Sequence, residues 1–282
     1  MQPIDGRQLA AALAAKTKDR IAALGFTPGL GVLLVGDDAA SHKYVSLKEK
    51  AAAAAGMLFE KRLLPASTTQ EDVAAVIAEF NSREDIHGII VQLPLPAPLN
   101  ADAAIALIDP AKDADGFHPE NVARFKAGNA RVTPVLTAAI MALIDASGQP
   151  VDGRFALVIG NSQTFYEPLK TAFSAAGAFP VFMGADAPDI KARTPKAEII
   201  VVAAGRAGLL TGDMFAPGTV VIDVGTNTLA DGRYVGDVDA ASCATVQGWL
   251  TPVPGGVGPV TVAMLLANTV TLAEQRHAAP KS

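Results

Sequence analysis

Short apolar runs alternate with helix-like segments in the first half of the chain, and this alternation restricts the fold more than any other feature. Runs at residues 30–36, 58–64 and 88–93 indicate buried strands, and the segments 41–55 and 68–81 between them have the character of helices. A strand–helix–strand–helix–strand order is typical of a parallel sheet with helical crossovers. The first half of the chain therefore predicts an α/β domain.

The pattern begins again after Pro134, which indicates a second domain. Its expected strands are 155–160, 179–183, 198–203 and 220–224, and its expected helices are 137–146 and 166–176. This order predicts a dinucleotide-binding fold. We expect an N-terminal parallel-sheet α/β catalytic domain of residues 1–136 and 258–282, and a Rossmann-like dinucleotide-binding domain of residues 137–257. The last helix, 261–274, is expected to return to the first domain.

Charge and composition exclude several classes of partner. The net charge is −5 and no basic stripe is present, which argues against nucleic acid. The single cysteine, Cys243, forms no intrachain disulfide, and a reducing compartment is its simplest setting. Residues 1–24 have the pattern of an amphipathic helix rather than a secretion signal, and the apolar run 51–55 is too short to cross a bilayer. We therefore expect a soluble cytoplasmic protein with no membrane partner and no bound metal.

A rigid loop precedes the last helix. Residues 251–261 read TPVPGGVGPVT, so prolines restrict φ at some positions while glycines permit close backbone approach at others. Such a segment can neither continue a helix nor lie inside a sheet. Because a helix follows directly, the loop presents free backbone N–H groups to a ligand.

Polar side chains gather at the predicted carboxyl edge of the first sheet. Tyr44 and Lys48 are four residues apart and so share one face of a helix that follows a strand. Gln92, flanked by Val91 and Leu93, ends the third strand at the same edge, where ligands of parallel sheets bind.

A carboxylate-rich turn follows at residues 109–118. It contains Asp113 and Asp115 before a glycine, but its spacing is not that of an EF-hand, so a metal site is not favoured. Lys112 and Asp113 are expected to form a solvated pair on this loop.

These segments together resemble the motifs of the bifunctional methylenetetrahydrofolate dehydrogenase/cyclohydrolase family. The Pro/Gly loop matches the family's TPVPGGVGPMT at every position except Val260, and the three other segments match YVxxK, VQLPLP and KDxDGFH. The resemblance implies oxidation of 5,10-methylenetetrahydrofolate with a nicotinamide cofactor, followed by hydrolysis of the methenyl product to 10-formyltetrahydrofolate. It also implies a homodimer and a place in purine biosynthesis.

The same resemblance implies roles for individual residues. The implied catalytic residues are Lys48, Tyr44, Gln92 and Asp115. The implied substrate-binding residues are Tyr44, Val91, Leu93, Asp115, Pro254, Gly255 and Gly256. A neutral lysine can act as base toward water, and a carboxylate can accept two N–H bonds from a pterin.

The cofactor loop departs from the family pattern. The family's GRSxxVGxP corresponds to residues 160–168, where Gly160 and Ser162 match but Asn161 replaces the arginine and Tyr166 replaces a glycine. Asparagine cannot supply a charge to the 2′-phosphate of NADP, and a tyrosine ring is expected in the space that glycine leaves for a pyrophosphate.

The cofactor is therefore NADP by family resemblance, with NAD left open. An NAD enzyme would use Asp186, at the end of the second strand of that domain, to accept the ribose 2′-OH. The expected cofactor-binding residues are Gly160, Asn161, Ser162, Asp186, Ala204, Gly205 and Thr226. The segment 201–208 resembles the family's AxGxPG loop, with Arg206 and Ala207 in place of Lys and Pro.

Two alternatives remain open at this point. The chain could be a cyclohydrolase only, or a non-catalytic folate-binding paralogue with weakened dinucleotide binding. Asp223 and Asp237, in segments that match the family's VIDVG and GDV motifs, could bind a ligand or could be buried residues that cap loops.

Overall fold

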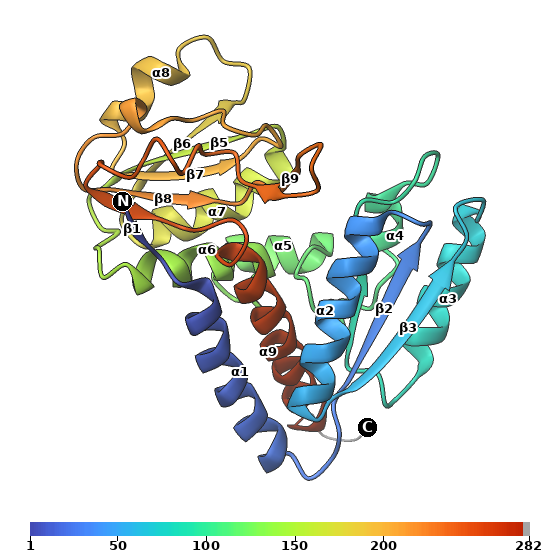
Figure 1. The fold of residues 1–282 in the computed structure, drawn as a ribbon. Helices are drawn as coiled ribbons and strands as arrows, with labels where there is room; N and C mark the ends of the chain where they lie inside the picture. The colour runs from blue at the N-terminus through green and yellow to red at the C-terminus, as the bar shows by residue number, and fades with distance from the viewer. Residues whose placement is uncertain (279–282) are drawn as a thin grey trace. The chain divides into compact units, whose positions relative to one another are not determined.

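The computed structural model describes residues 1–278, without the side chains of residues 163 and 164. The chain forms two compact units (Figure 1). One, called here the three-stranded unit, comprises residues 11–135 and 262–278. The other, the six-stranded unit, comprises Met1–Ala10 and Leu136–Thr261.

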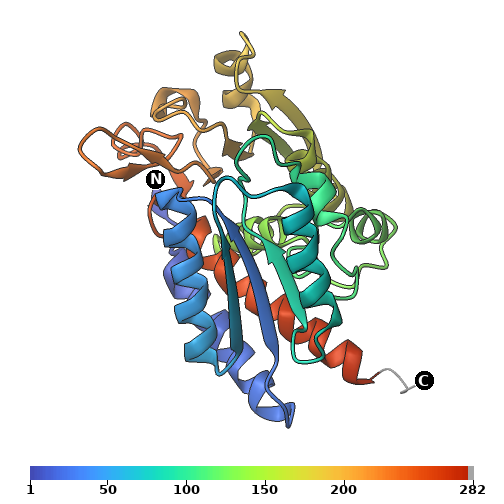
Figure 2. The ribbon, with the colours of Figure 1, turned by 90° about the vertical axis from the view of Figure 1, so that its right-hand side faces the viewer.

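The three-stranded unit has a parallel sheet in the order β3-β2-β4. Its strands are β2 (Gly29–Val35), β3 (Leu58–Leu64) and β4 (Gly88–Val91), and its crossover helices are α2 (Ala39–Ala55) and α3 (Gln70–Ser82). Because the chain steps from β2 outward to β3 and then back past β2 to β4, the two right-handed crossovers lie on opposite faces of the sheet (Figure 2). The parallel sheet predicted from the sequence is confirmed.

Local signals explain where these helices begin and end. Asp38 caps α2 by accepting a hydrogen bond from the Ser41 N–H, and Gly56 ends the helix in the left-handed conformation. Thr69 and Asp72 form a capping box at the start of α3.

The C-terminal helix α9 (Val257–Ala278) completes the core of this unit, as predicted. It begins at Val257 rather than at residue 261, so the last residues of the Pro/Gly segment are helical, contrary to the expectation from the sequence. Leu265, Leu266 and Val270 pack in one cluster with Leu30 and Val32 of β2. The helix is long and apolar enough to cross a membrane, but 56 % of its most apolar stretch is buried inside the protein, and a core helix meets the same criterion. The other helices of the chain's first half are α1 (Gly6–Ala23), α4 (Ala101–Ile105) and α5 (Pro119–Lys126).

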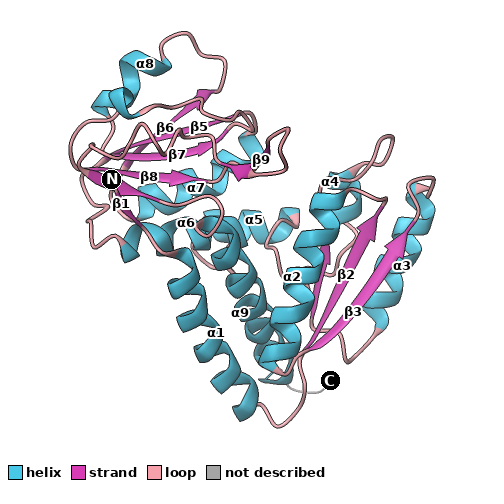
Figure 3. Ribbon diagram, viewed as in Figure 1, coloured by secondary structure: helices cyan, strands magenta, loops and turns pink. Residues whose placement is uncertain are grey.

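The six-stranded unit has a parallel sheet in the order β1-β11-β8-β7-β5-β6, part of which is visible in Figure 3. Its strands are β1 (Gln2–Pro3), β5 (Phe155–Gly160), β6 (Phe179–Gly184), β7 (Ile199–Ala203), β8 (Thr219–Asp223) and β11 (Gly248–Leu250). The remaining elements are α6 (Val135–Ala146), α7 (Gln163–Ala175), α8 (Ile190–Arg193) and the hairpin of β9 (Asn227–Thr228) and β10 (Tyr234–Val235), with 3₁₀ turns at Thr194–Lys196 and Gly212–Met214.

The first ten residues belong to the six-stranded unit, which differs from the domain division expected from the sequence. They were expected with the first domain, but β1 pairs with β11, and the Ile4 N–H donates to the Leu250 carbonyl at 3.0 Å. A two-residue strand has no periodicity to reveal it, and the strand that it pairs with, β11, lies about 250 residues away in the sequence. The helix α7 also begins at Gln163, three residues earlier than expected.

Candidate active site and dinucleotide site

Lys48 lies on α2 and reaches the end of β4. Its Nζ donates a hydrogen bond to Oε1 of Gln92 at 2.8 Å. The Gln92 side-chain N–H₂ donates in turn to the Leu93 carbonyl at 2.7 Å, which orients the amide oxygen toward the lysine. The sequence placed both residues at the carboxyl edge of this sheet, and the structure brings them into direct contact there.

Asp115 is the charged neighbour of Lys48. Burial lowers the pKa of Lys48 below its usual value, while the charge of Asp115 opposes that shift. Burial also raises the pKa of Asp115 to about 6, with Lys48 lowering it and Asp113 raising it further. Environments that bring the pKa values of a lysine and a carboxyl group closer together are typical of acid–base sites.

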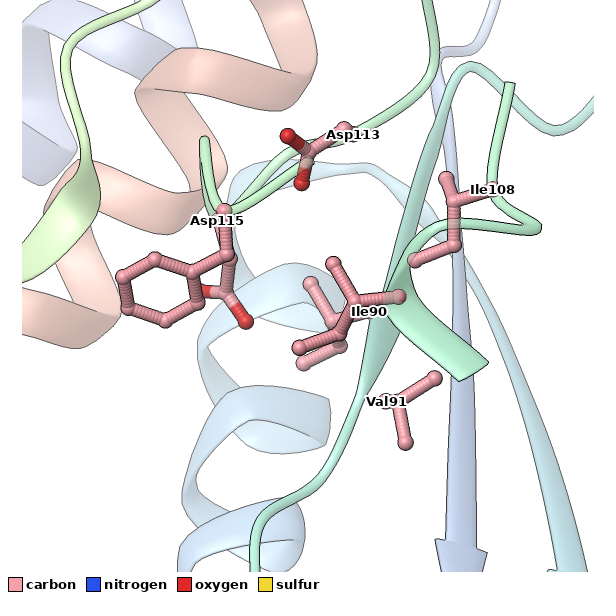
Figure 4. Close-up of a pocket in the computed structure, with 7 residues that line it drawn as sticks. Ile90, Val91, Ile108, Asp113 and Asp115 are labelled. Carbon is pink, nitrogen blue, oxygen red and sulfur yellow. The ribbon is translucent and has the colours of Figure 1, made fainter. Parts of the chain in front are cut away.

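A small pocket opens beside Asp115 (Figure 4). It is lined by Ile90, Val91, Ile105, Ile108, Asp113, Asp115 and Phe117. The carboxylate of Asp115 points toward Ile90 and helix α2. An apolar wall with a few converging polar groups is the usual composition of a small-molecule site.

Lys112 and Asp113 are not the solvated pair expected from the sequence, because each is only 1 % exposed. Asp113 accepts hydrogen bonds from the Gly116 and His118 N–H groups at 3.0 and 2.8 Å, and from the Asn121 amide at 3.0 Å. These contacts hold the turn that carries Asp115. Asp113 is therefore a positioning residue that the sequence did not reveal.

Lys112 ties the same turn to the end of helix α3. Its Nζ donates to three carbonyls at the end of α3, those of Phe80, Asn81 and Arg83, at 3.0, 2.8 and 2.6 Å. A cation at a helix C-terminus satisfies carbonyls that have no partner within the helix. Burial lowers the pKa of Lys112 to about 8.

The other expected substrate residues of the three-stranded unit differ in exposure. Val91 is buried and lines the pocket, Leu93 is exposed, and Tyr44 is partly exposed on α2, one turn before Lys48. Among the residues that the structure describes, no three His, Cys, Asp or Glu side chains group as metal ligands.

The Pro/Gly loop is closely packed within the six-stranded unit. Gly255 has φ of +115°, which favours glycine, and a Cβ added at Gly256 would lie 2.7 Å from the Pro252 carbonyl oxygen. A Cβ at Gly6 would overlap the carbonyl of Gly256. The loop is thus rigid, and a role in substrate binding for Pro254, Gly255 and Gly256 stays a prediction.

A strand–turn–helix unit forms the expected dinucleotide site. Gly160 ends β5, and Ser162 caps α7 by accepting a hydrogen bond from the Phe165 N–H at 3.3 Å. The Asn161 amide donates to the Ala204 carbonyl at 3.2 Å, which ties this turn to the loop after β7. A helix N-terminus that follows a strand is the usual place for a pyrophosphate.

Tyr166 does not project from that turn as the sequence predicted. Its side chain is 8 % exposed, its ring packs at 5.0 Å from the ring of Phe182, and its hydroxyl donates to the Pro180 carbonyl at 3.3 Å. The ring is therefore buried against β6, because an aromatic side chain at this helix position meets an apolar strand beneath it. The tyrosine that stands in place of the family's glycine therefore adds its ring to the core of this unit.

Two buried aspartates shape the neighbouring loops. Asp237 accepts hydrogen bonds from the successive N–H groups of Ala204, Gly205 and Arg206, at 2.5, 3.1 and 2.7 Å. Asp223 accepts from the Gly225, Asp237 and Val238 N–H groups, and burial raises its pKa to about 6. These bonds decide between the two alternatives left open by the sequence: both carboxylates cap loops. Thr226 is exposed on the loop that follows β8.

Asp186 lies two residues beyond β6 and is exposed. It forms an ion pair with the guanidinium of Arg206. Its expected contact with a ribose hydroxyl stays a prediction.

The fold and the two sites define a class of protein: a two-unit α/β enzyme with a lysine-based site on one sheet and a dinucleotide site on the other. Comparison with models of protein families then identifies one particular family. Residues 4–115 match the tetrahydrofolate dehydrogenase/cyclohydrolase catalytic domain, and residues 134–277 match the NAD(P)-binding domain of the same family. The chain belongs to the tetrahydrofolate dehydrogenase/cyclohydrolase family.

Individual relatives are similar to this chain over almost its entire length. The bifunctional protein FolD of Acidiphilium cryptum is 46 % identical over 274 residues, covering 97 % of this chain and 98 % of the relative. The crystal structure of the bifunctional FolD of Campylobacter jejuni has a TM-score of 0.92 and 38 % identity, covering 98 % and 99 % of the two chains. The Trypanosoma brucei FolD structure, a complex with NADP and an inhibitor, has a TM-score of 0.94 and 37 % identity, covering 98 % of each chain.

Proposed function

We propose that this protein oxidises 5,10-methylenetetrahydrofolate to 5,10-methenyltetrahydrofolate with NADP and then hydrolyses the product to 10-formyltetrahydrofolate. The single observation that carries this proposal is the hydrogen bond from Lys48 to Gln92 beside Asp115, at the carboxyl edge of the three-stranded sheet. The family membership supports both activities.

Lys48 acts as the base in the hydrolysis. Water attacks the methenyl carbon, a C–O bond forms, and the water proton passes to Nζ. The remaining hydroxyl proton then leaves the carbinol oxygen as the C=O bond forms and the C–N5 bond breaks, N5 takes up one proton, and the formyl group stays on N10. Burial lowers the pKa of Lys48 and the charge of Asp115 opposes that shift, while the cationic methenyl group would lower the pKa further and so favour the neutral amine that accepts the water proton. Gln92 holds the amine in position through the 2.8 Å hydrogen bond.

Asp115 binds the pterin. As a carboxylate it accepts two N–H bonds from the aminopyrimidinone edge, a charge-assisted bidentate contact. Tyr44 supplies an aromatic face to the folate, and Val91 and Leu93 supply further contacts.

The dinucleotide site fits a nicotinamide cofactor. A Cβ at Gly160 would lie 3.1 Å from the Ala203 carbonyl oxygen, so glycine avoids a tight contact where β5 ends, and the helix N-terminus with Ser162 follows at once. Gly160, Asn161 and Ser162 would hold the phosphates, with Ala204, Gly205 and Thr226 on the neighbouring loops. When bound, NADP supplies the two-electron acceptor for the one-carbon bridge. The buried ring of Tyr166 supports an open turn, which favours the bifunctional enzyme over a cyclohydrolase alone.

We also infer a cytoplasmic homodimer that serves purine biosynthesis and binds neither nucleic acid nor membranes. Support for a subunit interface comes from large apolar side chains exposed on the edge strands of the two sheets, Leu63 on β3 and Phe179 on β6.

Parallel assays test the proposed function. Turnover of 5,10-methylenetetrahydrofolate is measured with NADP and with NAD, and hydrolysis of supplied methenyltetrahydrofolate is measured without nucleotide. Lys48→Met is expected to lower hydrolysis at least 100-fold while folate binding stays measurable. Lys50→Met, an exposed lysine of the same helix, is the matched control. Unchanged hydrolysis in Lys48→Met would refute the assigned role.

A further inference from the structure

The ion pair between Arg206 and Asp186 lies across the carboxyl end of β5, the strand that leads into the expected dinucleotide site. In the sheet register Gly160 of β5 is the partner of Gly184 on one side and of Ala203 on the other. Asp186 follows Gly184 by two residues, and Arg206 follows Ala203 by three. Since neighbouring strands lie about 4.8 Å apart, the loops after β6 and β7 start about 10 Å from each other. The Arg206–Asp186 pair joins these two loops in front of β5.

We propose that Arg206 binds the 2′-phosphate of NADP and that Asp186 is the counter-ion that Arg206 holds when no phosphate is bound. This inference rests on the proposed function, because it assumes a dinucleotide at this edge. It assigns the choice between NADP and NAD to two residues outside the loop that joins β5 to α7.

The position of the pair supports this assignment. In parallel dinucleotide-binding sheets the ribose nearest the adenine lies at the end of the strand that follows the phosphate turn, which here is β6. Asn161 carries no charge, and its amide N–H is already donated to the Ala204 carbonyl. Nearby cations on α8 have other partners: Arg193 pairs with Asp189, and Lys191 pairs with Asp213.

The way in which Arg206 is anchored also supports its assignment to the 2′-phosphate. The Arg206 N–H donates to the buried carboxylate of Asp237 at 2.7 Å, so the base of the side chain is held in place. The tip is free to change partners, because the side chains of Arg206 and Asp186 are 43 % and 87 % exposed. An exposed ion pair contributes little stability, whereas a guanidinium binds a phosphate dianion through two parallel hydrogen bonds.

The two residues should act in opposite directions on specificity. Arg206 attracts the 2′-phosphate, while Asp186 competes for the guanidinium and repels the dianion. With NAD, the same carboxylate accepts a hydrogen bond from the ribose 2′-OH. Removing Arg206 should therefore weaken NADP alone, and removing the charge of Asp186 should strengthen NADP and weaken NAD.

Equilibrium binding tests the inference without turnover. Isothermal titration calorimetry compares adenosine 2′,5′-bisphosphate with adenosine 5′-phosphate on the full chain. For Arg206→Gln the Kd of the bisphosphate should rise about 10- to 100-fold, the range for loss of hydrogen bonds to a charged group, while the Kd of the monophosphate changes less than about threefold. Asp186→Asn should lower the bisphosphate Kd several-fold. Arg206→Lys should restore part of the affinity.

The controls separate this inference from the proposed function. Arg193→Gln, another paired surface arginine of this unit, should leave both Kd values unchanged. The Asp237 contact uses the backbone of residue 206, so the Arg206 variants should keep the melting temperature of the parent. If Arg206→Gln keeps the parent's preference for the bisphosphate, or loses both ligands equally, this inference is overturned while the proposed function stands. A parent chain that binds neither ligand and reduces neither nucleotide overturns both.

Discussion

His87 should make the stability of the three-stranded unit depend on pH between 7 and 5. The residue is 3 % exposed and comes just before β4. Its Nδ1 accepts a hydrogen bond from the Gly29 N–H at 3.1 Å, so the ring proton resides on Nε2, which has no partner among the described residues. The ring lies among those of Phe26 and His277, at 5.4 and 5.7 Å. Protonation at Nδ1 would break the bond to Gly29 and place a charge in this buried setting, close to other basic groups.

The size of the effect follows from the pKa shift. Burial, with smaller contributions from His277, Arg276 and Lys112, lowers the pKa of His87 from 6.5 to about 4. The unfolded chain therefore binds more protons than the folded chain between these values, and stability falls as the pH falls. From pH 7 to pH 5 this group alone should remove about 2 kcal/mol from the free energy of unfolding, and about 3.4 kcal/mol once the pH is well below 4.

Urea unfolding followed by circular dichroism at pH 7, 6 and 5 measures this loss. His87→Asn is the comparison variant, because its Oδ1 can accept the Gly29 N–H bond and does not titrate. We expect the difference in stability between parent and variant to change by about 2 kcal/mol from pH 7 to pH 5, in favour of the variant at low pH. Parallel pH profiles for the two proteins would refute the reasoning.

Three further predictions concern the sites. Lys112→Met removes the side-chain donor to three carbonyls at the end of α3 and should lower stability by about 2–4 kcal/mol, measured by urea unfolding at pH 7; an unchanged midpoint would contradict the capping role. Because the pKa of Asp115 is about 6, the KM for methylenetetrahydrofolate should rise as the pH falls below 6, and Asp115→Asn should have a higher KM without this rise; the same acid limb in the variant would assign it to another group. Tyr166→Gly should lower the melting temperature, with a loss of about 3–5 kcal/mol, and leave the Kd of NADP within about threefold; a Kd lowered tenfold would mean that the ring obstructs the cofactor.

Much of the fold was predictable because its signals are local. Apolar runs of strand length, separated by helical segments, require a parallel sheet, and the sheet in turn brings residues at strand ends to one edge. That reasoning was enough to place Lys48 and Gln92 at one edge, and the family resemblance added Asp115 to the same site. The family motifs added the chemistry, which periodicity alone does not specify.

Other features depend on partners far away in the sequence, and only the tertiary structure decided them. The strand β1 exists because β11 lies beside it, and Lys112 is buried because the end of α3 offers three carbonyls. Tyr166 was placed at the phosphate turn from its position in the motif, but its ring is buried because Phe182 and Pro180 lie beneath it. The sequence by itself determined the main strands and crossover helices of both sheets and the edge that carries the polar residues, since these follow from neighbouring residues. The direction in which each side chain points was decided by the tertiary structure, because it depends on what packs against that side chain.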